Sequence, residues 1–110
     1  MTRNGFVSPK RAVINIAGAG DNTIIAAPGA NIKIKIVKML FVCTAAVAVT
    51  FRSGANNLTG AMSFGVSGGL GYDGDLYPLE MNPNEAFIIN LSGAIQVSGF
   101  AEYIVEAIST

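Results

Sequence analysis

Histidine and tryptophan are absent from this 110-residue chain, and cysteine occurs once, at Cys43. Without histidine, the chain lacks the side chain that most often acts as a general base or as a neutral metal ligand. A single cysteine excludes an intrachain disulfide and every zinc site built from several cysteines. Because Cys43 lies inside an apolar run, we expect an inert core thiol. A free thiol is typical of proteins that fold in a reducing cytoplasm.

Charge is also scarce in this sequence. Charged residues make up 13% of the chain, whereas soluble domains average about 25%. Apolar residues reach 51%, and a chain of this length buries roughly 65% of the surface that it exposes when unfolded. One core therefore forms without disulfides or metals. The low charge is typical of small domains that cover part of their surface with neighbouring subunits.

The few charges are segregated along the chain. Residues 1–52 hold all seven lysines and arginines and one acid, Asp21, for a net charge of +6, and residues 53–110 hold six acids and no base. Either strands from the two halves lie side by side and compensate each other, or the molecule has a basic face and an acidic face suited to contacts between subunits. The net charge is zero and no basic run contains aromatic residues, so we expect no nucleic-acid partner.

No segment predicts a membrane span or a secretory leader. The longest apolar stretch without charge, Met39–Phe51, has 13 residues, fewer than the ~20 that a membrane-spanning helix needs. We therefore expect no membrane partner. Residues 1–10 are polar and lack the apolar centre of a signal peptide. Gly5 and Pro9 interrupt regular structure there, so we interpret this segment as an N-terminal arm ahead of one domain at residues 11–110.

Alternating apolar and polar residues dominate the domain and predict β-strands. Strands bounded by turn residues are expected at 11–18, 22–27, 30–42, 45–53, 58–66, 86–92, 94–99 and 100–108. The last segment also has helical spacing, but its β-branched residues and the preceding strands favour a strand. Residues 67–85, rich in Gly, Pro and Asp, are expected to be irregular. About eight strands and no convincing helix predict an all-β, single-domain antiparallel β-sandwich that is jelly-roll-like.

The segment at 30–42, ANIKIKIVKMLFV, changes its pattern part of the way along. Ile32, Ile34 and Ile36 alternate with polar residues, and the alternation stops at Val37. We expect a bend or a β-bulge at that point. The residues after it are mostly apolar, which predicts a strand that is half solvated at its beginning and covered on both faces at its end. A long loop or another subunit would have to supply the second cover.

The sequence predicts no catalytic residue. GVSGG, residues 65–69, matches the pattern around a nucleophilic serine. That pattern requires a strand-to-helix elbow and a histidine partner. Neither is available to Ser67, so we interpret it as a serine in a turn and expect a protein that is not an enzyme.

An acidic loop carries the one pattern with ligand chemistry. Asp73, Asp75 and Glu80 offer oxygen atoms to a hard cation, but their spacing departs from the calcium-loop pattern. A solvated loop is therefore favoured, and we predict no metal site and no cofactor. Tyr72 and Tyr77 lie beside the aspartates, which leaves contact with a sugar or another ligand as an open alternative.

Several motifs follow one another in a characteristic order. NTI opens a strand, a Pro-Gly turn and the long Ile/Val/Lys strand come next, and an Ala/Val-rich strand ends in TFRSG before LTGAM and a Gly-rich turn. NLSGA then leads into a closing strand that contains GFAEY. Over residues 21–106 this order resembles small all-β virion proteins of tailed bacteriophages, and among them the staple or cement subunits that decorate capsids.

The resemblance implies a non-enzymatic structural protein on the outer surface of the virion head, made in the host cytoplasm. Its implied partners are the major capsid protein and copies of itself, in a homodimer or a homotrimer. The interface residues that we expect from the basic arm and the apolar segment are Arg3, Phe6, Lys10, Arg11, Met39 and Phe41. Two alternatives stay open: a tail, collar or fibre-associated virion protein, and a small carbohydrate- or receptor-binding β-sandwich module.

Overall fold

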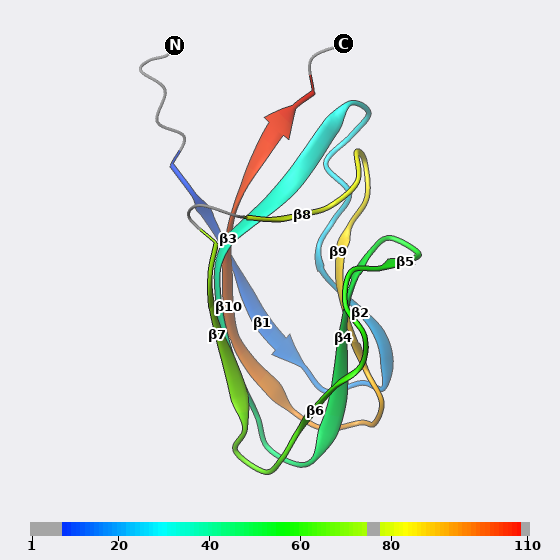
Figure 1. Ribbon diagram of the computed structural model, residues 1–110, viewed down its shortest axis with the longest axis vertical. Helices are drawn as coiled ribbons and strands as arrows, with labels where there is room; N and C mark the ends of the chain where they lie inside the picture. Colours follow the sequence, from blue (N-terminus) through cyan, green and yellow to red (C-terminus); the bar gives the residue numbers. More distant parts are fainter. Residues whose placement is uncertain (1–7, 75–77, 109–110) are drawn as a thin grey trace.

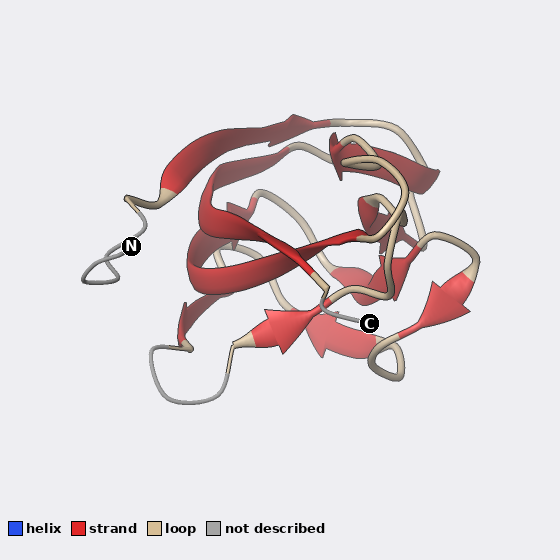
Figure 2. Cartoon of the chain, turned by 90° about the horizontal axis from the view of Figure 1, so that it is seen from above, coloured by secondary structure: helices blue, strands red, loops and turns tan. Residues whose placement is uncertain are grey.

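The protein folds into two stacked antiparallel β-sheets (Figure 1). The computed structural model describes residues 8–74 and 78–108, and every regular element in these ranges is a strand (Figure 2). No helix in this part of the chain is long and apolar enough to cross a membrane. The predicted all-β, single-domain antiparallel sandwich is confirmed.

We name each sheet after one of its central strands. The β10 sheet has the order β1 (Lys10–Ile16), β10 (Val97–Ala107), β3 (Ile32–Cys43) and β7 (Gly69–Asp73), with β8 (Leu79–Glu80) also paired to β3. The β9 sheet has the order β2 (Gly20–Ile25), β9 (Phe87–Leu91), β4 (Val47–Ser53) and β5 (Asn56–Asn57), with β6 (Met62–Phe64) also paired to β4. β1 begins and β10 ends at the same end of the molecule, whose long axis measures 45 Å (Figure 1).

The strand pairing follows from one long hairpin folded over on itself. The first half of the chain pairs with the second: β1 with β10, β2 with β9, β3 with β7 and β8, and β4 with β5 and β6. Rolling this hairpin also brings β10 against β3 and β9 against β4. The result is the nested strand order of a jelly roll.

A β-bulge at Val37 divides β3 into two halves. Val37 is the extra residue where the register against β10 shifts. Before the bulge Ile34 and Ile36 are buried, and after it Met39 and Phe41 are buried. One added residue moves the inward-facing set from even to odd positions, because side chains alternate with a period of two. The bulge expected at the break in the pattern is thus confirmed.

The second half of β3 has one buried face, which corrects the expectation that both faces would be covered. Leu40 and Val42 point outward and are 48% and 47% exposed. The apolar run MLFV therefore combines two inward side chains with two outward ones. Within the described chain, no loop or strand covers the outward pair to the extent that the core is covered.

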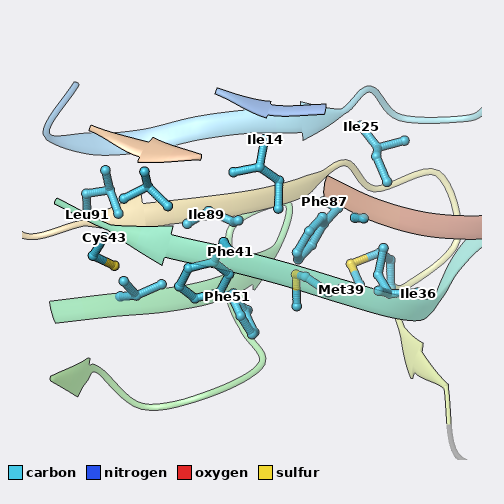
Figure 3. Close-up of a cluster of buried hydrophobic side chains, with 14 of the residues drawn as sticks. Ile14, Ile25, Ile36, Met39, Phe41, Cys43, Phe51, Phe87, Ile89 and Leu91 are labelled. Atoms are coloured by element: carbon cyan, nitrogen blue, oxygen red, sulfur yellow. The ribbon is translucent and has the colours of Figure 1, made fainter. Parts of the chain in front are cut away.

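The core lies between the two sheets and is packed with aliphatic and aromatic side chains (Figure 3). Phe41 and Phe51 meet edge to face, with ring centroids 6.1 Å apart, and Phe51 meets Phe87 in the same way at 5.7 Å. Such pairs add about 0.5–1.5 kcal/mol beyond the burial of their area. In β4, Val47, Val49 and Phe51 share the inward face and are all buried, which matches the alternation of its sequence.

Several expected segments differ from the observed strands. Residues 67–85 are not irregular, because they contain β7 and β8. In β7, Gly69 and Gly71 alternate with Leu70 and Tyr72, which are the two side chains that pack against the core. Two apolar residues are too few to predict a strand from alternation. Residues 94–99 and 100–108 form one strand that starts at Val97, and 58–66 contributes only three strand residues. β1 begins at Lys10, the last residue of the expected arm.

The backbones of β10 and β3 approach so closely that Gly99 admits no side chain. A Cβ atom at Gly99 would collide with the carbonyl oxygen of Leu40 and lie 2.6 Å from the Cα atom of Phe41. Gly71, on the outward face of β7, has no atom within 4 Å of the same position. The two glycines therefore form a matched pair for substitution.

We predict that Gly99→Ala lowers the free energy of unfolding by about 1–3 kcal/mol, the usual cost of forcing extra volume into packed structure. Gly71→Ala is the control and should change it by no more than about 0.5 kcal/mol. Urea unfolding followed by circular dichroism measures both. Equal midpoints for the two variants would contradict the close approach of β10 and β3.

Cys43 should react with thiol reagents only when the domain unfolds. Its side chain is fully buried, and burial raises the pKa of the thiol, which disfavours the reactive thiolate. We predict negligible labelling by an aromatic disulfide reagent in native buffer and stoichiometric labelling in denaturant. Because the chain has one cysteine, the signal reports this site alone. Rapid labelling of the native protein would contradict this prediction and show that the core opens locally around Cys43.

Candidate interaction surface

The outward face of the β10 sheet carries side chains in rows that cross the strands. Val13, Phe100, Leu40 and Gly71 occupy matching positions on β1, β10, β3 and β7, and we call them the apolar row. Val13 is 72% exposed and Leu40 is 48% exposed, and Val42 continues the apolar surface on β3. The domain thus has a complete core and still presents apolar side chains to solvent.

A second row, two residues away along each of the same strands, consists of charges of alternating sign. Arg11, Glu102, Lys38 and Asp73 lie in register on β1, β10, β3 and β7, and we call them the charged row. Arg11 donates a hydrogen bond to Glu102 at 2.7 Å. The guanidinium of Arg11 also lies 4.4 Å from the ring centroid of Phe100, a cation–π distance. The charged row therefore borders the apolar row and contacts it.

The segregated charges of the two chain halves meet within the β10 sheet. Its basic strands β1 and β3 alternate with β10, β7 and β8, which carry acids. The ion pairs among the described residues are Arg11–Glu102, Lys33–Glu80, Lys35–Glu106 and Arg52–Asp21. In three of them a base from the first half meets an acid from the second. The charges compensate between neighbouring strands, as the first of the two interpretations requires.

The bulge in β3 decides which expected interface residues reach the surface. Met39 and Phe41 are 1% and 0% exposed and fill the core, so their expected place in an interface is wrong for the folded chain. The outward residues of that segment are Leu40 and Val42, which a continuous alternation from Ile36 would have placed inside. The break in the alternation at Val37 is the sequence signal that could have identified Leu40 and Val42 as outward-facing.

The remaining expected interface residues lie at or before the beginning of β1. Lys10 and Arg11 are exposed there. Arg3 and Phe6 lie outside the described residues. Lys10 also borders a hollow of about 300 Å³ at this end of the sandwich. The other lining residues of this end hollow are Ile25, Ala26, Pro28, Ile32, Tyr103 and Val105.

The outward face of the β9 sheet is polar and differs from the face just described. A shallow hollow of about 260 Å³ is lined by Thr50, Arg52, Asn57 and Asn90. Asp21 accepts a hydrogen bond from Asn90 and one from Arg52, each at 2.8 Å. Asn90 first and Arg52 second stabilise the carboxylate and lower the pKa of Asp21. This polar hollow offers hydrogen-bond donors but no aromatic side chain.

The motifs with chemical interest are structural in the part of the chain that is described. Ser67 lies in the turn from β6 to β7 with φ of 62°, and no helix follows it. Glu80 forms an ion pair with Lys33. Asp75 and Tyr77 fall outside the described residues. Within those ranges, no three His, Cys, Asp or Glu side chains gather where they would hold a metal ion.

No family model, curated protein or solved structure matches this chain. Its function is therefore inferred from its own surfaces. These are the apolar and charged rows on one sheet, the end hollow beside β1, and the polar hollow on the other sheet.

A hydrogen-bonded carboxylate secures the chain between β8 and β9. Glu85 accepts hydrogen bonds from the Ser53 hydroxyl at 2.7 Å, from Asn82 at 3.1 Å and from Asn56 at 3.4 Å. The hydroxyl oxygen of Ser53, which is fully buried, accepts the backbone N–H of Asn82 at 2.8 Å. These donors favour the carboxylate, and Ser53 contributes most to a pKa of Glu85 below its ordinary value of 4.5.

We predict that Glu85→Gln weakens the dependence of stability on acid. Since the pKa of Glu85 is lower in the folded chain, its ionised form stabilises the fold above its ordinary pKa of 4.5, and this contribution is lost as the pH falls through the folded-state pKa. The variant should be less stable than wild type at neutral pH and lose less stability on acidification. Thermal midpoints between about pH 3 and pH 7 measure this difference. Two parallel curves would contradict the role of Glu85.

Proposed function

We propose that this chain is a non-enzymatic structural protein of a tailed-bacteriophage virion, where it decorates the outer surface of the head and binds neighbouring major capsid proteins. The observation that carries the proposal is the apolar row, which is exposed although the core is complete. Contiguous apolar surface on a soluble domain marks a site of association. The order of motifs in residues 21–106 supports the same assignment.

The end of the sandwich at which β1 begins supplies the surface for the shell. Lys10 and Arg11 are exposed there, and the end hollow lies beside them. The arm that precedes Lys10 adds Arg3 and Phe6, a base and an aromatic residue. This combination suits an acidic, partly apolar surface formed where capsid proteins meet.

Binding of this kind stabilises a shell by mass action. A subunit that binds the assembled lattice, and not separated capsid proteins, shifts the equilibrium toward the lattice. Each contact can be modest, because the same site repeats over the whole head. The chain therefore needs a rigid domain and two attachment surfaces rather than a catalytic site.

Removal of the arm tests the proposed attachment. Deleting residues 2–8 leaves β1 intact, so the domain should keep its thermal midpoint. We predict that the shortened chain binds undecorated heads about tenfold more weakly or worse, a loss of ~1.4 kcal/mol in binding free energy. Co-sedimentation of the protein with heads measures occupancy. Unchanged occupancy would contradict the role of the arm, and a cryo-EM map of the virion with this chain on the tail would contradict the assignment to the head.

The polar hollow favours one second candidate, a carbohydrate- or receptor-binding module. Arg52 and two asparagines line it, and Arg52 Nε is buried without a hydrogen-bond partner within the described structure. Hydrogen-bonding side chains of this type suit the hydroxyl groups of a sugar. A glycan array with wild type and Asn90→Ala separates this candidate from the first, because a decoration protein needs no glycan.

A further inference from the structure

We propose that two copies of this chain pack face to face through the outward face of the β10 sheet. The twofold axis lies in the interface, runs parallel to the strands and passes midway between β10 and β3. The surface consists of the apolar row and the charged row. The occupant is a second copy because this rotation brings every charge of the charged row opposite one of the other sign. A twofold axis directed across the strands does not.

Rotation about an axis parallel to the strands keeps every row at its own height and reverses the order of the strands. β10 of one copy then faces β3 of the other, and β1 faces β7. In the charged row the order is positive, negative, positive, negative, so every charge meets one of opposite sign. At the centre, Glu102 of each copy faces Lys38 of the other.

The apolar row is complementary in shape under the same rotation. Phe100 faces Leu40 of the second copy, and these two pairs form an apolar centre beside the axis. Val13, the most protruding member at 72% exposure, faces Gly71 of the second copy. The space above Gly71 is open, with no atom within 4 Å of its Cβ position. A large side chain thus meets the position in the row that has none.

A twofold axis directed across the strands gives the opposite result. Along such an axis each strand faces its own copy, so Arg11 would meet Arg11 and Glu102 would meet Glu102 if the axis followed the charged row. If the axis followed the apolar row, the charged row would face the row of Asn15, Ser98 and Val42, and its charges would be covered without opposite partners. Burying unpaired charges is costly. The charge order therefore selects the axis parallel to the strands.

The size of the surface sets the strength of the pair. Four strands spaced about 4.8 Å apart, with the apolar row, the charged row and the adjoining row of Asn15, Ser98 and Val42, cover on the order of 1,000 Å² in total when two copies stack. This area is near the lower limit for specific interfaces. We therefore expect a dimer with a dissociation constant in the micromolar range.

The dimer does not depend on the proposed place in the head, but it has a consequence for it. Because the axis is parallel to the strands, the two copies of Lys10 lie at the same end of the dimer. The two β1 strands then begin at one end of the dimer, where the two copies of Lys10 face the same surface at two points. Such a pair would bridge two neighbouring capsid proteins.

Charge reversals, alone and mixed, test the dimer in the absence of heads. Lys38→Glu brings two acids together at each of the two central contacts, and Glu102→Lys brings two bases together. Each variant alone should dimerise at least about tenfold more weakly than wild type. An equimolar mixture restores both contacts in a heterodimer and should return to within about threefold of the wild-type dissociation constant. Sedimentation velocity over a concentration series measures all three samples.

Rescue by mixing reports a contact between chains, because mixing cannot relieve repulsion between Lys38→Glu and its neighbours within one sheet. Circular dichroism and thermal midpoints establish that each variant folds. If one of the two charge variants fails to fold, Val13→Glu tests the dimer instead. Val13 is exposed in the single chain, so its substitution should leave the fold intact and still weaken the dimer. Ser63→Glu, on the outward face of the other sheet, is the control and should change nothing.

A wild-type chain that stays monomeric up to about 1 mM overturns the dimer. A mixture that is as weak as the two single variants overturns the proposed axis. Neither outcome affects the binding of the chain to heads, which is measured separately by co-sedimentation.

Discussion

The bulged antiparallel pairing of β3 with β10 is the constraint on which the rest of the structure depends. These are the longest strands, and they form the centre of the β10 sheet. One extra residue at Val37 changes the phase of β3, so Met39 and Phe41 enter the core and Leu40 and Val42 leave it. Without that residue the core would lose its central aromatic ring, and the outer face would carry different side chains.

The jelly-roll pairing turns a simple asymmetry of the sequence into a structured surface. Bases occupy the first half of the chain and acids the second, and the rolled hairpin interleaves the two halves in one sheet. Neighbouring strands then attract each other within the chain. The same interleaving produces a row of alternating sign, and a row of this kind with an even number of members is complementary to its own copy after rotation about an axis parallel to the strands.

The surfaces of the domain are distributed over different sides, which suits an assembly protein. The apolar and charged rows lie on one sheet, the end hollow and Lys10 lie at one end, and the opposite sheet is polar. Arg11 belongs both to the charged row and to the end at which β1 begins, and the other residues of the two surfaces differ.

The sequence alone determined the class of fold, because alternation with a period of two in strand-length segments is compatible with little else. The local pattern also indicates the alternation of β4 and the bulge at Val37. Tertiary structure decided the rest. β7 was not predicted, because Gly69 and Gly71 remove half of its pattern and its pairing with β3 supplies the missing restraint. The outward position of Leu40 was not predicted either, since the residues after the bulge are nearly all apolar and only the pairing of β3 with β10 fixes which of them point inward. The charged row depends on register between four strands that are distant in sequence, and register exists only once the chain has folded.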